Sequence, residues 1–187
     1  MDAITLLRQD HVEVLAMLDE LERAPVDGRP VTPEVSAARK QLVTELVMAE
    51  SAHEAIEEQY FWPSVRHWLE EGRDVAAPAV EQEQAAKQVL QELEVGDPKF
   101  EALVSQTIAD AREHIAYEER EVWPIVQQRM AQSELDELGE KMTTAKKAAP
   151  TRPHPHTPPK PGVLKTAGVA AAAVDKMRDT AAGRGKD

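Results

Sequence analysis

The stretch from His53 to Pro63 reads HEAIEEQYFWP, and the stretch from His114 to Pro124 reads HIAYEEREVWP; both fit H-x3-E-E-x3-W-P. Residues four apart lie one turn above each other on the same face of an α-helix. His53 is thereby paired with Glu57, and His114 with Glu118. An imidazole and a carboxylate stacked in this way form half of a metal site. Two such halves facing each other across a bundle suit a pair of ions bridged by carboxylates.

Helix start and stop signals divide the first 149 residues into four long helices, predicted over about 2–24, 33–71, 78–96 and 97–130. Thr32 is the expected cap of the second helix, because its hydroxyl is followed by a proline that needs no backbone donor. In the same way, Pro78 is expected to start the third helix. The predicted fold class is all-α, an up-down four-helix bundle.

Pro63 and Pro124 should kink their helices at the same depth, because each proline removes a donor and crowds the carbonyl four residues earlier. A shorter extra helix is expected to follow the bundle and to end near Lys146. Ser133 and Asp136 are the expected caps of this short helix.

The sequence after residue 149 differs from the bundle in composition and charge. Residues 1–149 carry 15 basic and 31 acidic residues, a net charge of −16, whereas residues 150–187 carry 7 and 3, a net charge of +4. We therefore expect a bundle domain over 1–149, an extended proline-rich linker over 150–162 that does not join the core, and a basic, alanine-rich helix and tail over 163–187. The thin apolar stripe of this last helix consists of Val163, Ala167, Ala170, Val174 and Met177. The tail has three open alternatives: docking on the acidic bundle, covering the metal pocket or remaining free.

Composition limits the compartment and the partners. The chain has no cysteine, which excludes disulfides, thiolate metal sites and a cysteine nucleophile. No run approaches the roughly 18 apolar residues of a membrane span, and the first residues resemble neither an anchor nor an export signal, so the expected location is the cytoplasm. The acidic bundle repels phosphate, which argues against nucleic acid as a partner.

Two further polar residues fall on the apolar stripes that are predicted to face the core. His11 lies in the stripe of the first helix, and Glu83 lies among Ala79, Ala86 and Leu90 in the third. A lone histidine on such a stripe is more often a satisfied core residue. The joint pattern nevertheless favours metal binding, because it would otherwise require several independent buried polar residues. The inward set then comprises three imidazoles and three carboxylates, His11, His53, Glu57, Glu83, His114 and Glu118.

This ligand set suits two iron ions better than one zinc ion, which prefers four ligands, or magnesium and calcium, which prefer oxygen alone. Tyr60, seven residues after His53, shares its helical face. It either lines the pocket, as a phenolic ligand or hydrogen-bond donor, or simply packs. Glu58 and Glu119 lie 100° away from their neighbours and are expected to be solvated or to support the ligands from outside.

At these residues the sequence resembles the hemerythrin-like, or HHE cation-binding, family over roughly Asp10 to Pro155. The resemblance is carried by Asp10-His11, the two repeated phrases, AVEQEQAAK at 79–87 and LGEKMTTAKKAAPTRPHP at 138–155, and is strongest to actinobacterial members. It implies a four-helix bundle with an oxo- or carboxylate-bridged non-heme di-iron site. The ligands that carry over are His11, His53, Glu57, His114 and Glu118, with the two glutamates as bridges. The family's usual phrase has histidine where this chain has Glu83, and Lys87 follows four residues later.

Three functions are compatible with such a site. The first is a catalase-like enzyme that disproportionates hydrogen peroxide in oxidative stress, with Tyr60 as a proton donor. The second is reversible binding of oxygen or nitric oxide, as a carrier or sensor, and the third is a structural bundle that retains metal. The anionic oxygen of Glu83 stabilises ferric over ferrous iron, which disfavours oxygen carriage. We therefore rank chemistry with peroxide or other reactive oxygen and nitrogen species first, and gas binding second.

Overall fold

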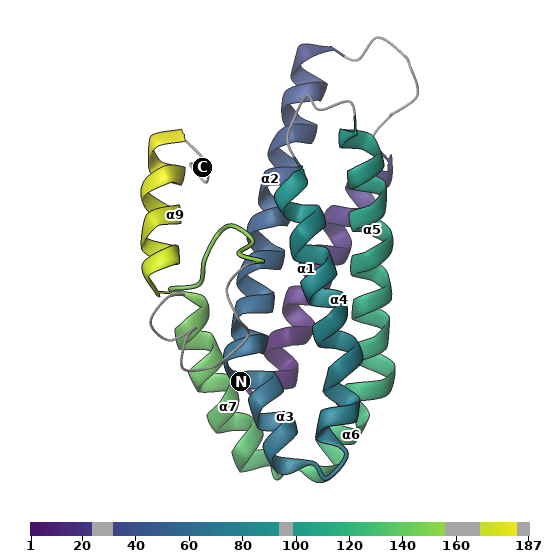
Figure 1. Cartoon of the computed structure of the whole chain (residues 1–187), viewed down its shortest axis with the longest axis vertical. Coiled ribbons are helices and arrows are strands. Elements are labelled where there is room, and N and C mark those ends of the chain that lie inside the picture. Colours follow the sequence, from purple (N-terminus) through teal and green to yellow (C-terminus); the bar gives the residue numbers. More distant parts are fainter. Residues whose placement is uncertain (24–31, 94–98, 156–168, 183–187) are drawn as a thin grey trace.

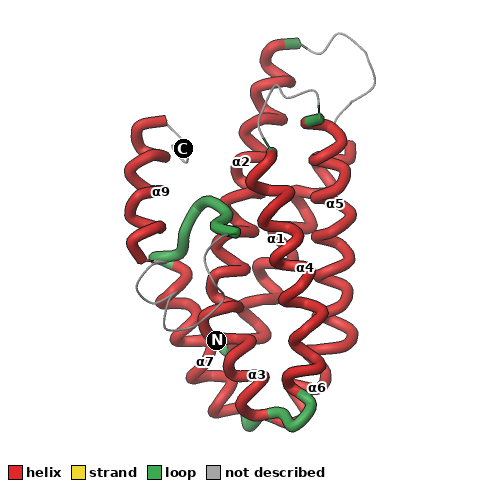
Figure 2. The backbone as a smooth tube through the Cα atoms, viewed as in Figure 1, coloured by secondary structure: helices red, strands yellow, loops and turns green. Residues whose placement is uncertain are grey.

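The computed structural model describes residues 1–23, 32–93, 99–155 and 169–182, and the regular structure in these ranges is helical. Four long helices form the bundle (Figures 1 and 2): α1 (Ala3–Arg23), α2 (Pro33–Ile56), α4 (Gly72–Glu92) and α5 (Phe100–Tyr117). Successive helices run in opposite directions, so the predicted all-α up-down bundle is confirmed. Within the described ranges, no helix combines the length and the apolar composition that crossing a membrane requires.

Each repeated phrase ends its long helix in a π turn. Helix α2 passes through η1 (Glu57–Phe61) into α3 (Trp62–Trp68), and α5 passes through η2 (Glu118–Val122) into α6 (Trp123–Arg129). The α-helical pattern is therefore interrupted at both predicted positions, but by a wide turn that precedes the proline. The prolines then occupy the first turn of α3 and α6, where a missing backbone donor costs little.

The corner between α3 and α4 overturns one prediction. Helix α4 begins at Gly72, and Pro78 lies inside it. The chain turns at Leu69, which is extended, and Gly72 then comes so close to α3 that a Cβ atom would lie 2.2 Å from the Val65 carbonyl oxygen. Only glycine fits this contact, and it sets the start of α4. The exposed Pro78 costs the helix one backbone donor, a loss that the packing of α4 against α3 and α5 outweighs.

The predicted extra helix is α7 (Gln132–Lys146), and it packs along α1 and α2. Its expected caps were wrong by two residues. The backbone N–H of Ala131 donates to Glu134 Oε2 at 2.9 Å, whereas Ser133 lies inside the helix. By contrast, Thr32 caps α2 as predicted, because its hydroxyl accepts the N–H of Val35 at 3.4 Å.

The last described helix, α9 (Val169–Ala182), lies outside the bundle, above α7 in the view of Figure 1. The predicted start at Val163 falls outside the described residues. The predicted apolar stripe was wrong for Val174 and Met177, which are exposed, whereas Asp175 and Asp179 are buried. The reason is that α9 faces residues 151–154 with its acids: Asp179 pairs with Arg152, and Asp175 pairs with His154.

The first residues of the predicted linker also differ from expectation. Residues 151–155 are half-buried rather than free, and with Ala149 and Pro150 they lie against α2. Residues 156–162 of the linker are outside the described ranges.

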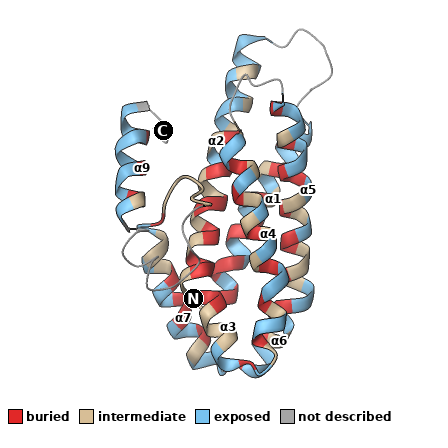
Figure 3. Cartoon of the chain, viewed as in Figure 1, coloured by how far each residue is buried: buried red, intermediate tan, exposed pale blue. Residues whose placement is uncertain are grey.

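The core has three layers along the bundle axis, and Figure 3 shows in red the buried residues along the helices. One apolar layer surrounds Leu7, Trp62 and Trp123, and another surrounds Leu18, Leu46 and Leu90. The predicted inner stripe of the first helix is buried throughout: Ile4, Leu7, His11, Val14, Leu18 and Leu21. His11 lies between the two apolar stretches of this stripe. The other inward imidazoles and carboxylates occupy the same level, so a layer of ionisable groups lies between two apolar layers.

Candidate metal centre

Four side chains from the two repeated phrases meet in the middle layer. One ligand atom each from His53, Glu57, His114 and Glu118 lies within 4.8 Å of all the others, and all four residues are buried. His53 Nε2 is 3.1 Å from Glu57 Oε2, and His114 Nε2 is 3.7 Å from Glu118 Oε1. His114 Nε2 also lies 3.9 Å from Glu57 Oε2, so the two halves face each other. In each pair the histidine lies in the last α-helical turn and the glutamate is the first residue of the π turn, so the four-residue spacing still places both side chains on one face.

His11 joins this group from α1. Its Nε2 lies 3.1 Å from Glu118 Oε2, and its ring stacks on the indole of Trp123 with centroids 4.7 Å apart. The side chains of His11 and Glu118 are 2% and 0% exposed. The structure therefore brings five of the six predicted ligands together.

Each of the three histidines has a polar partner on its other ring nitrogen. His11 Nδ1 is 3.2 Å from Glu119 Oε1, and His114 Nδ1 is 3.3 Å from Gln82 Oε1. His53 Nδ1 is 3.3 Å from Asp10 Oδ2. An oxygen acceptor at Nδ1 places the proton there and leaves the lone pair of Nε2 facing the cluster, as in metal-binding histidines. Sequence reasoning assigned no role to Asp10 or Gln82, because nothing in their spacing marks them.

The inner atoms of this set form no hydrogen bond outside the cluster, and their contacts with one another are the ion-pair distances given above. These atoms are Nε2 of the three histidines, both carboxylate oxygens of Glu57 and of Glu118, and Oε2 of Glu83. Buried polar atoms are almost always satisfied, so eight orphaned atoms on six residues need an explanation. All eight are good ligands for a first-row transition metal. The residues present therefore fit a bound metal.

Glu83 is the sixth predicted ligand, and it is held differently from the other five. The indole N–H of Trp62, from the first Trp-Pro pair, donates to Glu83 Oε1. Burial and repulsion from Glu57 raise the pKa of the Glu83 carboxyl well above its usual range. Glu83 is not one of the four residues whose ligand atoms lie within 4.8 Å, although it shares a cavity of about 20 Å³ with His114. Its place as a ligand remains a prediction.

The metal-free cluster balances its charge with protons. Burial alone would lower the pKa of His114, but the carboxylates of Glu118 and Glu57 raise it to about 10. Burial likewise opposes the charge on His53, yet Glu57 and Asp10 raise its pKa well above the usual range. Burial would raise the pKa of Glu57, but His53 and His114 hold it far below its usual value. A bound metal ion would replace these imidazole protons.

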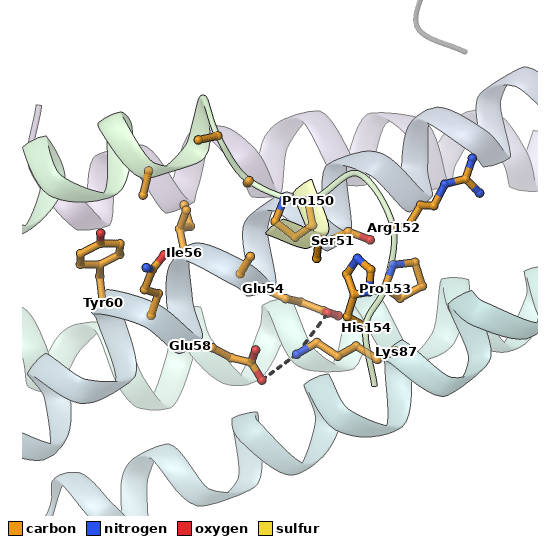
Figure 4. A pocket seen from close by; sticks show the side chains of 16 residues that line it. Ser51, Glu54, Ile56, Glu58, Tyr60, Lys87, Pro150, Arg152, Pro153 and His154 are labelled. Carbon is orange, nitrogen blue, oxygen red and sulfur yellow. Dashed lines mark ion pairs between the residues drawn. The ribbon is translucent and has the colours of Figure 1, made fainter. Parts of the chain in front are cut away.

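A second buried network of charged residues joins α2 and η1 to α4 (Figure 4). The Lys87 ammonium is 2.6 Å from Glu58 Oε1 and 4.0 Å from Glu54 Oε2. Glu58 is buried, so the predicted solvent-exposed alternative is wrong; its carboxylate pairs with Lys87 and accepts a hydrogen bond from Gln84. Burial raises the pKa of Glu54 to about 8, against the attraction of Lys87.

Tyr60 lies at the edge of this network rather than beside the imidazoles. It helps to line a cavity of about 130 Å³ together with Glu54, Glu58 and Lys87. Tyr60 belongs to η1, and a π turn holds more residues than an α-helical turn, so it rotates Tyr60 away from the face of His53. Its predicted catalytic role is untested.

The comparisons with known proteins agree with this geometry. A family model described as the hemerythrin HHE cation binding domain matches residues 2–126, a range that contains all six predicted ligands. An uncharacterized hemerythrin-like protein from Schizosaccharomyces pombe is 28% identical over 145 residues, which are 75% of this chain and 70% of that protein. The crystal structure of a hemerythrin HHE cation-binding domain-containing protein from Mycobacterium kansasii shares the fold, with a TM-score of 0.63 and 22% identity over 94% of this chain and 99% of that one. The chain thus belongs to the hemerythrin HHE cation-binding domain family.

Proposed function

We propose that this protein binds two iron ions and disproportionates hydrogen peroxide to water and oxygen, as a catalase-like oxidoreductase. The observation that carries this proposal is the set of eight orphaned nitrogen and oxygen atoms in the buried middle layer. Three imidazoles and three carboxylates exceed the four ligands that one zinc ion prefers. Their mixture of nitrogen and oxygen suits iron better than magnesium or calcium.

The residues have separate roles in this proposal. His11, His53 and His114 would hold the ions, and Glu57 and Glu118 would bridge them. Glu119, Asp10 and Gln82 fix the orientation of the three rings. When bound, the iron pair would supply Lewis-acid polarisation of peroxide and electron exchange between two peroxide molecules.

Glu83 and Tyr60 have supporting roles. The indole of Trp62 donates to Oε1 of Glu83, so Oε2 is the oxygen that is free to face the centre, and an ionised Glu83 would add negative charge there. That charge favours ferric iron, which is poorly suited to carrying oxygen and better suited to peroxide. Tyr60 is proposed as the proton donor, from its position on the cavity that also contains Glu58.

Reversible binding of oxygen or nitric oxide is the second candidate. The cavity of about 20 Å³ beside His114 has room for a small molecule such as water or a diatomic gas. This size suits oxygen and nitric oxide as well as the first contact with peroxide.

The direct test of the proposal is metal analysis with an absorption spectrum. Protein produced in iron-replete medium should contain close to two irons per chain and show the near-ultraviolet absorption of an oxo-bridged ferric pair. Added peroxide should be consumed with evolution of oxygen at an electrode. A protein that holds one zinc ion, or no metal, would contradict the proposal at its first step.

Asp10 offers a test of ring orientation. Asp10→Asn should weaken metal binding about 10–100-fold, because an amide accepts the His53 Nδ1 proton less well than the carboxylate does. Metal affinity measured by chelator competition would give the change. Glu13→Gln is the matched control, since Glu13 is an exposed acid on the same helix. Equal metal affinities in the two variants would show that Asp10 does not orient His53 for metal binding.

The boundary at residue 149 is also testable. The six candidate ligands all precede residue 119, so a chain truncated after Ala149 should remain a folded bundle with two irons. It should be less stable to heat, because the cavity containing Lys87 loses the wall formed by Pro150, Arg152 and His154. Circular dichroism and iron analysis would measure both effects. An iron-free or insoluble truncation would show that the tail completes the site.

A further inference from the structure

We infer that divalent metal ions enter the buried centre through an acidic passage between α4 and α5, which ends at Glu83 and His114. This inference rests on the proposed metal centre and adds how that centre is loaded. Apart from Glu83 and His114 at its inner end, the passage is lined by residues that are not proposed as ligands.

The burial of the cluster points to this side of the bundle. The side chains of His11, His53, Glu57 and Glu118 are at most 3% exposed. The side chain of His114 is 10% exposed, the largest value in the set. His114 and Glu83 line the cavity of about 20 Å³ between α2, α4 and α5. Of the five candidate ligands that contact one another, His114 is therefore the one that an arriving ion meets first.

This inner cavity continues to the surface. Gln82, Val89 and Asp110 line it and also line an outer groove of about 430 Å³ between α4 and α5. The outer groove is further lined by Gln88, Glu92 and Glu113, which are exposed. A path from solvent to His114 thus runs past Asp110 and Gln82.

Unsatisfied carboxylate oxygens occupy the inner part of the path. Glu50 Oε1, Glu54 Oε2 and Glu83 Oε2 have no hydrogen-bond partner, and all three residues are more than nine-tenths buried and line the inner cavity. The cavity is narrow and its carboxylates are buried, so an entering cation exchanges water for protein oxygens. Carboxylate oxygens can replace that water, which explains why such costly groups are retained there.

The charged side chains that line this passage differ from those that line the cavity containing Lys87. The outer groove is lined by three acids, Glu92, Asp110 and Glu113, and by no lysine or arginine of the described residues. The cavity of about 130 Å³ beneath residues 148–154 contains basic side chains, Lys87 and Arg152, that match its acids, Glu54 and Glu58. Clefts of one sign concentrate ions of the opposite sign, so cations are drawn to the α4–α5 side.

Loading kinetics of the full chain test the passage. Metal-free protein would be mixed anaerobically with ferrous ammonium sulfate, and uptake would be followed by the iron left for a chromogenic ferrous chelator. Gln88→Lys should slow uptake about tenfold at low ionic strength and Gln88→Glu should accelerate it, because Gln88 is an exposed wall of the outer groove. Added salt should reduce both effects, and the final iron content should stay unchanged.

The matched controls are the same two substitutions at Gln127, an exposed residue of α6 that lines neither the groove nor the inner cavity. A second variant, Asp110→Asn with Glu113→Gln, should also slow uptake. Equal uptake rates for the Gln88 and Gln127 variants would contradict metal entry between α4 and α5, while the proposed metal centre would be unaffected. Absence of bound iron at equilibrium in the unmodified chain would instead overturn the proposed function, so the two failures are distinguishable.

Discussion

Replacement of both His53 and His114 by alanine should reduce bound iron from two ions per chain to none. The two imidazoles belong to opposite halves of the cluster, and each lies within 4 Å of a carboxylate that is proposed as a bridge. Loss of both leaves one imidazole, His11, and the carboxylates, which are too few ligands for two ions. Iron analysis and the loss of near-ultraviolet absorption would measure the effect.

Stability complicates this variant, because each alanine leaves a buried carboxylate without its partner, at a cost of about 3–5 kcal/mol. The pair His53→Gln and His114→Gln keeps polar atoms in both places and should also lose iron while retaining its helical circular dichroism. His67→Ala, in an exposed histidine of α3, should change neither property. Full iron content in the folded glutamine variant would show that the repeated phrases do not bind the metal.

The substitution Glu83→His should change the reactivity of the centre rather than abolish metal binding. A neutral imidazole in place of a carboxylate makes ferrous iron easier to reach, so the variant should consume less peroxide and bind oxygen reversibly. The unmodified protein, once reduced, should autoxidise without a long-lived oxygen adduct. An oxygen electrode and a spectrophotometer distinguish these outcomes.

The Glu83→His substitution also removes the carboxylate oxygen that accepts the indole N–H of Trp62. A second variant is therefore needed to separate the effect of charge from the effect of this hydrogen bond. Glu83→Gln keeps an oxygen acceptor for Trp62 and removes only the negative charge. If charge decides reactivity, both variants should shift in the same direction. An unmodified protein that carries oxygen reversibly and leaves peroxide untouched would reverse the ranking of the two functions. Unchanged spectra in both variants would place Glu83 outside the ligand set.

Much of the bundle follows from local sequence. The apolar stripe of α1 and the spacing within the two repeated phrases predicted which residues face inward, because helical phase fixes direction over a few turns. The errors occur where packing outweighs local preference. Pro78 lies inside α4 because Gly72 allows a close corner with α3, and α9 turns Asp175 inward because His154 lies there.

By itself, the sequence determined the all-α fold class, the pairing of His53 with Glu57 and of His114 with Glu118, and the inward position of His11 and Glu83. These features depend on residues within one helix, whose relative directions are set by backbone geometry. The tertiary structure alone decided which oxygen orients each imidazole, that Trp62 binds Glu83, and that Lys87 neutralises Glu58. Each of these contacts joins different helices or turns, so its existence depends on how the elements pack and not on any spacing along the chain.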